Sequence, residues 1–262
     1  MNRSGHNAMK SGIVSLLVVS MLLLSACATK TDRETQDSND ASDYNAQLGL
    51  AYINQGRYEI AQNKLKKAIE QNPDNAVAHH YMAELYRRLG EFDKAETHFK
   101  EALDLAPKNS SLLNNYGVFL CDAKKYKEAY TYFDKVLKDP LYPSKGSVYE
   151  NIGLCAQSEG NLKTAEENLR FALRLNPQSP KSLLAMAQIS FDKQKYAASR
   201  KYFYQYLENA RHTPASLWLG ILLENRSGNK NRVASYVVLL KGKYPDSEEA
   251  ELLKKMQASG QL

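Results

Sequence analysis

The sequence predicts an all-α protein built from repeated pairs of helices. The segment YINQGRYEIAQNKLKKAIEQNPDN, from Tyr52, aligns without gaps with YRRLGEFDKAETHFKEALDLAPKN, which begins 34 residues later at Tyr86. Weaker copies contain CDAKKYKEAYTYFDKVLKDP from Cys121 and EGNLKTAEENLRFALRLNPQS from Glu159. A period of this length, with small and apolar residues recurring at matching positions, indicates stacked helix–turn–helix units.

Six repeats can be followed in order along the chain. Small residues stand where the two helices of a repeat cross closely, and prolines stand where the second helix ends. The recurring positions are, repeat by repeat, Leu48, Gly49, Tyr52, Ala61, Leu65, Ala68 and Pro73; Met82, Ala83, Tyr86, Gly90, Ala95, Phe99, Ala102 and Pro107; Tyr116, Gly117, Leu120, Ala129, Phe133 and Val136; Ile152, Gly153, Gly160, Ala165, Leu169, Ala172 and Pro177; Met186, Ala187, Phe203 and Tyr206; Gly228, Val233, Val237, Leu240 and Pro245.

These positions resemble those of the tetratricopeptide repeat, which implies a superhelix of about six helix–turn–helix units with a C-terminal capping helix. The cap is expected because a terminal repeat exposes an unstacked apolar face. The third repeat is two residues longer, through DPLYPSK, and the sixth is expected to carry one extra residue between Gly220 and Val233. The expected domain covers residues 42–262, with repeats at about 42–75, 76–109, 110–145, 146–179, 180–213 and 214–247 and the cap at 246–258.

The amino terminus has the layout of a secretory signal that ends in a modified cysteine. Arg3 and Lys10 precede an apolar run from Ile13 to Leu24, and these 12 residues are fewer than the roughly 20 that a spanning helix needs. The run closes in LSAC, which resembles the lipobox of bacterial lipoproteins. The resemblance implies cleavage before Cys27 and a covalent lipid on Cys27. A plain cleaved signal with an incidental cysteine is the alternative.

Residues 1–26 are therefore expected to be a signal peptide, and residues 27–41 a lipidated cysteine with a flexible tether. Residues 28–43 hold no large apolar side chain and cannot build a core. A tether of about 14 residues would let the domain move roughly 20 Å from the membrane. Ala28 follows the cysteine where the sorting rule of enteric-type bacteria places Asp for inner-membrane retention. Because this chain has Ala28 there instead of Asp, the rule implies that the lipoprotein is anchored in the periplasm-facing leaflet of the outer membrane.

The composition favours a binding module over an enzyme. His79, His80, His98 and His212 show no metal-ligand spacing with acids or thiols, and the sequence contains no phosphate-binding glycine loop or nucleophile elbow. Without the signal, 33 basic and 29 acidic side chains remain, too evenly mixed for a nucleic-acid stripe. We expect a monomer without metal, cofactor or nucleic acid, and an overlooked hydrolase site is the alternative from another class.

The resemblance also predicts where a partner binds. Positions 2, 5, 9, 12 and sometimes 13 of each repeat line the concave face in this family, and apolar side chains there suit an amphipathic helix or an extended peptide. Repeats that grip a carboxylate use Lys and Asn where this chain has Ala46 and Leu50, so no such clamp is expected. Packing within the domain is the alternative role, for Leu154 above all. The predicted groove residues are Leu50, Ile53, Asn54, His80, Glu84, Arg87, Arg88, Val118, Leu154, Leu184 and Phe191.

Two further cysteines are placed to form a disulfide. Cys121 and Cys155 lie 34 residues apart on the first helices of adjacent repeats, and packed helices with axes about 8–10 Å apart allow thiols to meet. An oxidising periplasm would favour the bond. The two-residue insertion between them obscures the register, so two buried free thiols remain the alternative.

Together, the lipobox, the polar segment, the six repeats and the cysteine placement resemble the type IV pilus biogenesis and stability lipoproteins (the PilW/PilF family). The resemblance implies a pilotin that binds secretin subunits in the periplasm and promotes their outer-membrane localisation and assembly. Attachment to an anchored partner replaces a dilute search with a high effective concentration at the membrane. The alternative is an outer-membrane scaffold for cell-wall or barrel-assembly enzymes.

Overall fold

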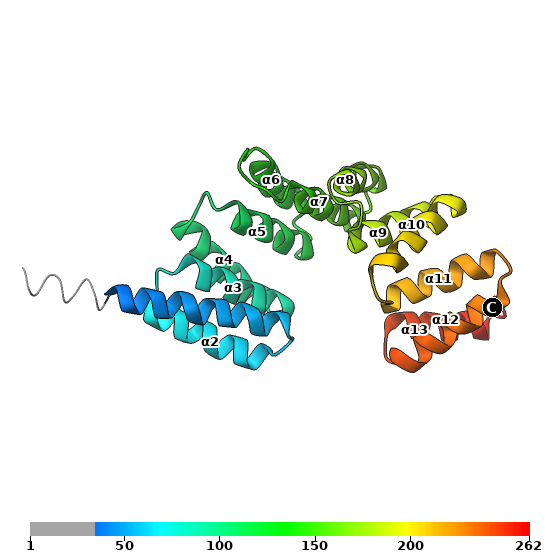
Figure 1. Cartoon of the computed structure of the whole chain (residues 1–262), viewed down its shortest axis with the longest axis horizontal. Helices are drawn as coiled ribbons and strands as arrows, with labels where there is room; N and C mark the ends of the chain where they lie inside the picture. The colour runs from blue at the N-terminus through cyan, green and yellow to red at the C-terminus, as the bar shows by residue number, and fades with distance from the viewer. Residues whose placement is uncertain (1–34) are drawn as a thin grey trace, which may run out of the picture. The chain divides into compact units, whose positions relative to one another are not determined.

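The computed structural model describes residues 35–262, and all regular secondary structure in this range is helical (Figure 1). The predicted signal peptide and Cys27 lie outside the described residues. No helix in the described part of the chain has the length and apolar character that crossing a bilayer requires. The fold-class prediction is confirmed, because the helices follow one another as antiparallel pairs.

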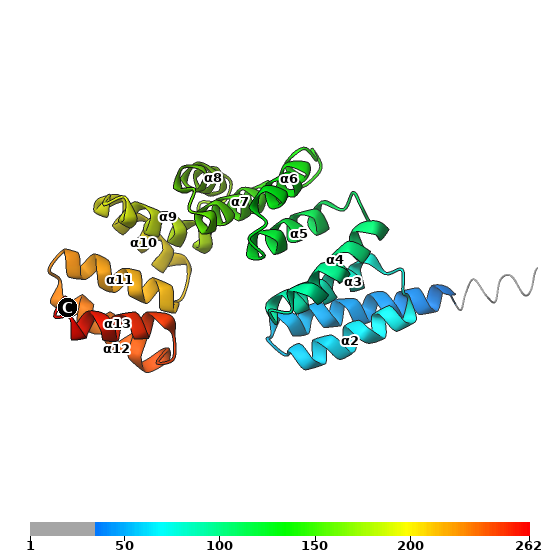
Figure 2. The same ribbon diagram turned by 180° about the vertical axis from the view of Figure 1, so that it is seen from behind.

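The pairs match the six predicted repeats and are followed by one further helix. Pairs such as α3/α4, α7/α8, α9/α10 and α11/α12 lie side by side in both views (Figures 1 and 2). After a first helix at residues 35–54, the helices are α2 Tyr58–Gln71, α3 Ala76–Arg88, α4 Phe92–Leu105, α5 Ser110–Asp122, α6 Tyr126–Leu137, α7 Lys145–Glu159, α8 Leu162–Leu175, α9 Pro180–Asp192, α10 Tyr196–Asn209, α11 Pro214–Arg226, α12 Lys230–Lys243 and α13 Glu248–Ala258.

The turn inside each pair fixes the register of the repeats. One residue in every such turn has a positive φ, a conformation in which glycine avoids a Cβ clash. The positions are Gly56, Gly90, Lys124, Gly160, Gln194 and Gly228. Successive spacings are 34 residues except between Lys124 and Gly160, where the spacing is 36. The insertion predicted in the third repeat is therefore present.

The extra residue expected in the sixth repeat is absent. Val233 follows Ser199 of the fifth repeat by the regular 34 residues, and both side chains are buried. The prediction was wrong because Gly220 was assigned to the small-residue position of its repeat. Regular spacing places Ile221 there, 34 residues after Ala187.

Close helix crossings explain the glycines within first helices. A Cβ added to Gly153 of α7 would lie 2.6 Å from Leu169 Cγ of α8, and one added to Gly117 would lie 2.6 Å from Phe133 Cε1. Both distances are far below van der Waals contact. The side chains of the second helices thus fill the space that these glycines leave.

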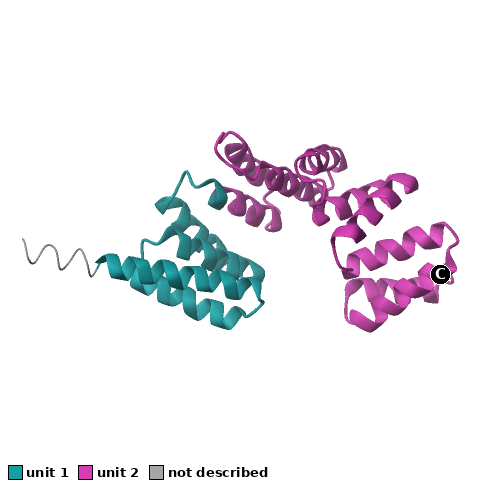
Figure 3. Cartoon of the chain, viewed as in Figure 1, with its two compact units in different colours: residues 1–112 teal, residues 113–262 magenta. Residues whose placement is uncertain are grey.

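The described part of the chain forms two compact units, residues 35–112 and 113–262 (Figure 3). The boundary falls within α5. In the N-terminal unit, Ala46, Ala68 and Ala78 form a buried cluster. The C-terminal unit has one core cluster around Leu169 and Met186 and a larger cluster that includes Phe203 and Leu240.

The first helix begins earlier than the sequence predicted. Residues 35–41 were assigned to the tether, but they are helical in the structure. Ser38 Oγ donates a hydrogen bond to Gln71 O at 2.7 Å, and Ser42 Oγ donates one to Ala68 O at 2.7 Å. The last carbonyls of a helix lack partners within it, and Ser38 supplies one to Gln71 O at the end of α2. Ser42 adds a second donor to Ala68 O, which also accepts the Asn72 N–H. A composition argument that considered only apolar burial missed this polar docking.

Candidate functional site

In the N-terminal unit, the predicted groove residues divide into buried and accessible groups. Leu50 is half-buried and Asn54 is exposed. Ile53, by contrast, is only 1% exposed, and His80 is 8% exposed. The structure therefore corrects these two assignments. Ile53 and His80 pack inside the unit and offer no open surface, because each first helix turns part of the expected inner stripe toward its own repeat.

Three charged residues of the predicted groove form a cluster on α3. Glu84 on α3 accepts hydrogen bonds from Arg87 Nε at 2.7 Å and from Arg88 Nε at 2.8 Å. Burial alone would raise the pKa of Glu84, but these two arginines hold it below its usual value. Arg88 also donates to Ile53 O at 3.4 Å. Arg88 thus connects α3 to the preceding repeat.

The histidines of this unit are structural. His79 Nε2 lies 2.9 Å from Pro73 O and donates to it, so His79 Nδ1 accepts the proton of His98 Nδ1 at 3.1 Å. Burial and the neighbouring His79 lower the pKa of His98 to about 4, and burial, opposed by Glu84, lowers that of His80 to about 4. Among the described residues, no group of three or more His, Cys, Asp or Glu is arranged to hold a metal ion.

In the C-terminal unit, the predicted groove residues are all partly exposed. Val118, Leu154, Leu184 and Phe191 are half-buried. Leu184 and Phe191 pack against the larger core cluster, and Leu154 packs against the cluster around Leu169. One side of Leu154, Leu184 and Phe191 therefore contributes to the core while the other remains available to a partner, so packing and binding are compatible here.

The sequence analysis missed two apolar residues of the same stripe. Trp218, the only tryptophan in the chain, follows Leu184 by 34 residues and is half-buried on α11. Leu222 follows Leu154 by two such intervals and is also half-buried. Extending the repeat spacing into the sixth repeat would have found both. A tryptophan in such a position is a strong candidate anchor for a bound peptide.

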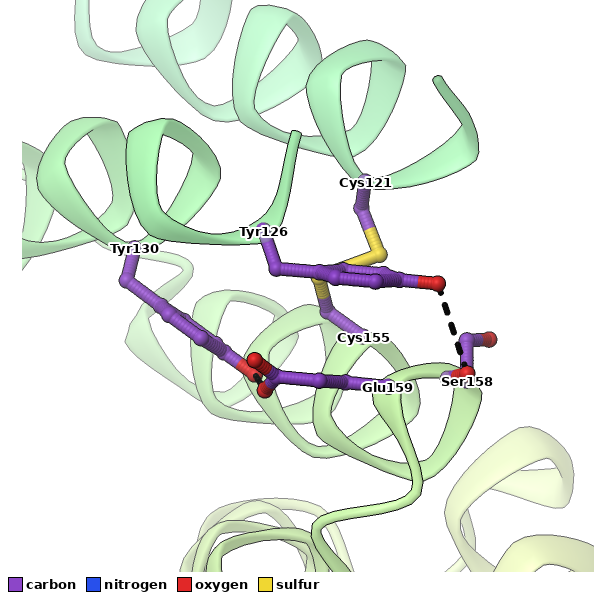
Figure 4. Close-up of a disulfide and its surroundings, with 6 residues drawn as sticks. All are labelled: Cys121, Tyr126, Tyr130, Cys155, Ser158 and Glu159. Atoms are coloured by element: carbon purple, nitrogen blue, oxygen red, sulfur yellow. Dashed lines mark hydrogen bonds between the residues drawn. A yellow bond between two sulfur atoms is a disulfide. The ribbon is translucent and has the colours of Figure 1, made fainter. Parts of the chain in front are cut away.

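A disulfide joins α5 to α7 within the C-terminal unit (Figure 4). The Cα atoms of Cys121 and Cys155 lie 5.7 Å apart, and Cys155 is 1% exposed. Because of the two-residue insertion, Cys155 lies two positions earlier in its repeat than Cys121. The structure thus contains the bond that the spacing predicted, rather than two free thiols.

Two tyrosines of α6 reinforce this connection (Figure 4). Tyr126 donates its hydroxyl to Ser158 O at 3.3 Å, and Tyr130 donates to Glu159 Oε2 at 2.7 Å. Burial and the adjacent carboxylate raise the pKa of Tyr130, which keeps its proton in place. Repeats three and four are held together on the side of their turns, close to Leu154.

Comparisons with known proteins agree with this architecture. The tetratricopeptide-repeat family model matches residues 47–110, 82–145 and 152–214. The chain is 34% identical over 247 residues to the type IV pilus assembly protein PilF of Pseudomonas aeruginosa, an alignment that covers 92% of this chain and 96% of that protein. An uncharacterised protein of Haemophilus influenzae is 28% identical over 152 residues, which cover 58% of this chain and 84% of that protein.

Two solved structures of related proteins are similar over most of their length. The structure of Pseudomonas aeruginosa PilF is 33% identical with a TM-score of 0.69, covering 84% of this chain and 99% of that one. The crystal structure of PilW, described as a widely conserved type IV pilus biogenesis factor, is 30% identical with a TM-score of 0.71, covering 82% and 99%.

Proposed function

Since the chain belongs to the PilF/PilW family of tetratricopeptide-repeat proteins of type IV pilus biogenesis, we propose that it is the pilotin of its pilus system. In this role it binds secretin subunits in the periplasm and brings them to the outer membrane, where they assemble into the multimeric pore. The observation that carries the proposal is the similarity to PilF, which extends over nearly the whole chain.

Binding is assigned to the half-buried apolar side chains of the first helices. Leu50 in the N-terminal unit and Leu184, Phe191 and Trp218 in the C-terminal unit suit an amphipathic helix or an extended apolar segment of the secretin. Their apolar surface is incompletely covered within the monomer, and burying it against a partner would stabilise a complex by about 25 cal/mol per Å².

Localisation is assigned to Cys27. One acyl chain binds a bilayer only marginally, whereas several chains give stable anchoring. A lipid on Cys27 would therefore hold the protein in the periplasm-facing leaflet of the outer membrane, and every bound secretin subunit would share that location. The gain is an effective concentration at the membrane rather than a new contact with the secretin.

The test separates anchoring from binding in cells that make pili. A Cys27→Ser protein should fold and bind secretin in solution but leave the outer-membrane fraction, and assembled secretin multimers should fall. A Leu50→Asp protein should stay in the membrane fraction but lose the secretin from crosslinked complexes. If Cys27→Ser protein remains in the outer membrane with normal secretin assembly, the anchoring mechanism is wrong. If crosslinking instead captures cell-wall or barrel-assembly enzymes, the pilotin role is wrong.

A further inference from the structure

Two adjoining hollows lie on the C-terminal unit, beside the second helices α8 and α10. The larger, of about 830 Å³, opens where the 139–144 connection, the start of α7 and the end of α8 meet. The smaller, of about 340 Å³, lies between α8 and α10. Arg174 lines both hollows, so together they form one continuous surface. None of the predicted groove residues lines either hollow.

The larger hollow has aromatic and aliphatic walls that are partly open to solvent. The rings of Tyr149 and Phe171 stack with centroids 5.2 Å apart, and the Arg174 guanidinium lies 4.0 Å from the Phe171 centroid. Phe171 is 45% exposed and Leu175 is 60% exposed. This concentration of exposed apolar side chains around a hollow is typical of a binding surface.

The charge of the surface has a single sign. The residues that line the two hollows include four basic side chains and no acidic one: Lys145, Arg170, Arg174 and Lys201. Arg170 is paired with Glu166 at 2.6 Å. For the other three, the structure of residues 35–262 records no ion pair. The lining residues therefore place positive charge next to apolar walls.

The other repeats show that packing does not require these residues. Each of the first five repeats has a buried residue at the same place in its second helix: Ala68, Ala102, Val136, Ala172 and Tyr206. Phe171 directly precedes Ala172 and Arg174 follows it by two positions, so the same offsets identify their equivalents in the other repeats. The equivalents of Phe171 are Lys67, Glu101, Lys135 and Gln205, and those of Arg174 are Glu70, Asp104, Lys138 and Glu208. An exposed aromatic residue at this position occurs only in the fourth repeat of these five, directly beside the lengthened connection.

We propose that this surface, the α8 surface (Lys145, Phe171, Arg174, Leu175 and Lys201), binds an extended acidic segment of a partner protein. An aromatic, proline or aliphatic side chain of the segment would enter the larger hollow against Phe171 and Leu175. Flanking carboxylates would meet Lys145, Arg174 and Lys201, and guanidinium–carboxylate pairs add geometric specificity. A hollow can accept a side chain of a bound peptide, whereas a membrane-binding surface inserts its own protruding side chains into the bilayer. The shape of the α8 surface therefore favours a peptide. The proposal does not depend on the pilotin role.

The test pans a display library of random linear peptides over the purified full chain in detergent. Two variants introduce residues that other repeats already use at the same positions, Phe171→Glu as in Glu101 and Arg174→Glu as in Glu70. Their helices should therefore form normally, which circular dichroism checks. Lys67→Glu is the matched control, since it places the same charge at the equivalent position of the first repeat.

Peptides retained by the wild-type chain should be enriched in Asp and Glu next to apolar residues. Their affinities should fall about tenfold or more with Phe171→Glu or Arg174→Glu, equivalent to at least about 1.4 kcal/mol, and should not change with Lys67→Glu. The absence of acidic peptides, or equal binding by the variants, would overturn the proposal. So would binding to phosphatidylglycerol vesicles that is abolished by the same two substitutions, because the α8 surface would then be a membrane contact.

Discussion

Removing the bond between Cys121 and Cys155 should destabilise the C-terminal unit by about 3–4 kcal/mol. The two residues are separated by 34 positions in the sequence. In the chain-entropy model, a crosslink contributes about 3 kcal/mol for a 15-residue loop and about 4.7 kcal/mol for a 100-residue loop. The loop closed here falls between these lengths, so the expected loss falls between these values, nearer the lower one.

The appropriate variant is Cys121→Ser combined with Cys155→Ala. Removing both sulfurs leaves neither position able to form another disulfide, and alanine at 155 avoids placing an unpartnered hydroxyl in a position that is 1% exposed. The hydrogen bonds from Tyr126 to Ser158 and from Tyr130 to Glu159 remain and keep α6 against α7. The variant should therefore keep its helical content and lose stability, not structure.

Urea denaturation followed by tryptophan fluorescence measures the loss, because the only tryptophan, Trp218, lies in the same compact unit. Reduction of the wild-type protein with dithiothreitol should lower the denaturation midpoint to that of the double variant, and the double variant should not respond. Free thiols at both Cys121 and Cys155 in the unfolded, unreduced wild-type protein would show that the bond is absent. A loss below about 1 kcal/mol with the bond present would refute the chain-entropy reasoning.

Three further predictions concern packing, pH and the inner surface. Gly153→Ala should lower the free energy of unfolding, measured by urea denaturation, by about 1–3 kcal/mol because the added methyl group overpacks the helix crossing. Gly242→Ala is the control: its added Cβ meets nothing within 4 Å, so the protein should be unchanged or more stable by up to about 1 kcal/mol. Equal effects of the two substitutions would contradict the crossing argument. The folded chain holds His98 neutral down to about pH 4, against 6.5 for a free imidazole, so stability should fall as the pH drops through this window. His98→Gln should flatten that dependence in denaturation midpoints, and an unchanged slope would exclude His98 as its source. Ile53→Asp should lower the free energy of unfolding by about 3 kcal/mol or more and unfold the N-terminal unit, because it buries a carboxylate. Leu50→Asp should change the melting midpoint little, because Leu50 is only half-buried. Similar losses of stability for both variants would contradict their different burial.

The repeat architecture could be predicted because its signals are local and recur. Three signals of the same helix pair recur along the chain: the spacing of 34 residues, the glycines of the turns and the small residues at the helix crossings. The two-residue insertion was visible for the same reason, as an interruption of a regular spacing. Where the prediction relied on a single residue, as with Gly220, it failed, since one glycine can also stand outside the repeated position.

The candidate site was only partly predictable, because position within a repeat gives the direction of a side chain but not what lies beyond it. Ile53 and His80 occupy inner positions, yet neighbouring helices cover them; Leu50 and Leu184 occupy similar positions and stay accessible. The docking of Ser38 and Ser42 on the end of α2 likewise depends on carbonyl groups more than 25 residues away in the chain.

The sequence by itself determined the helix pairs, their number and register, and the pair of cysteines that could be joined. Only the tertiary structure decided which inner side chains remain open to a partner, where the first helix begins, and that Phe171, Arg174 and the 139–144 connection meet around one hollow. The physical reason is that periodicity records contacts between residues a fixed distance apart, whereas exposure and cavities depend on every neighbour that the fold brings together.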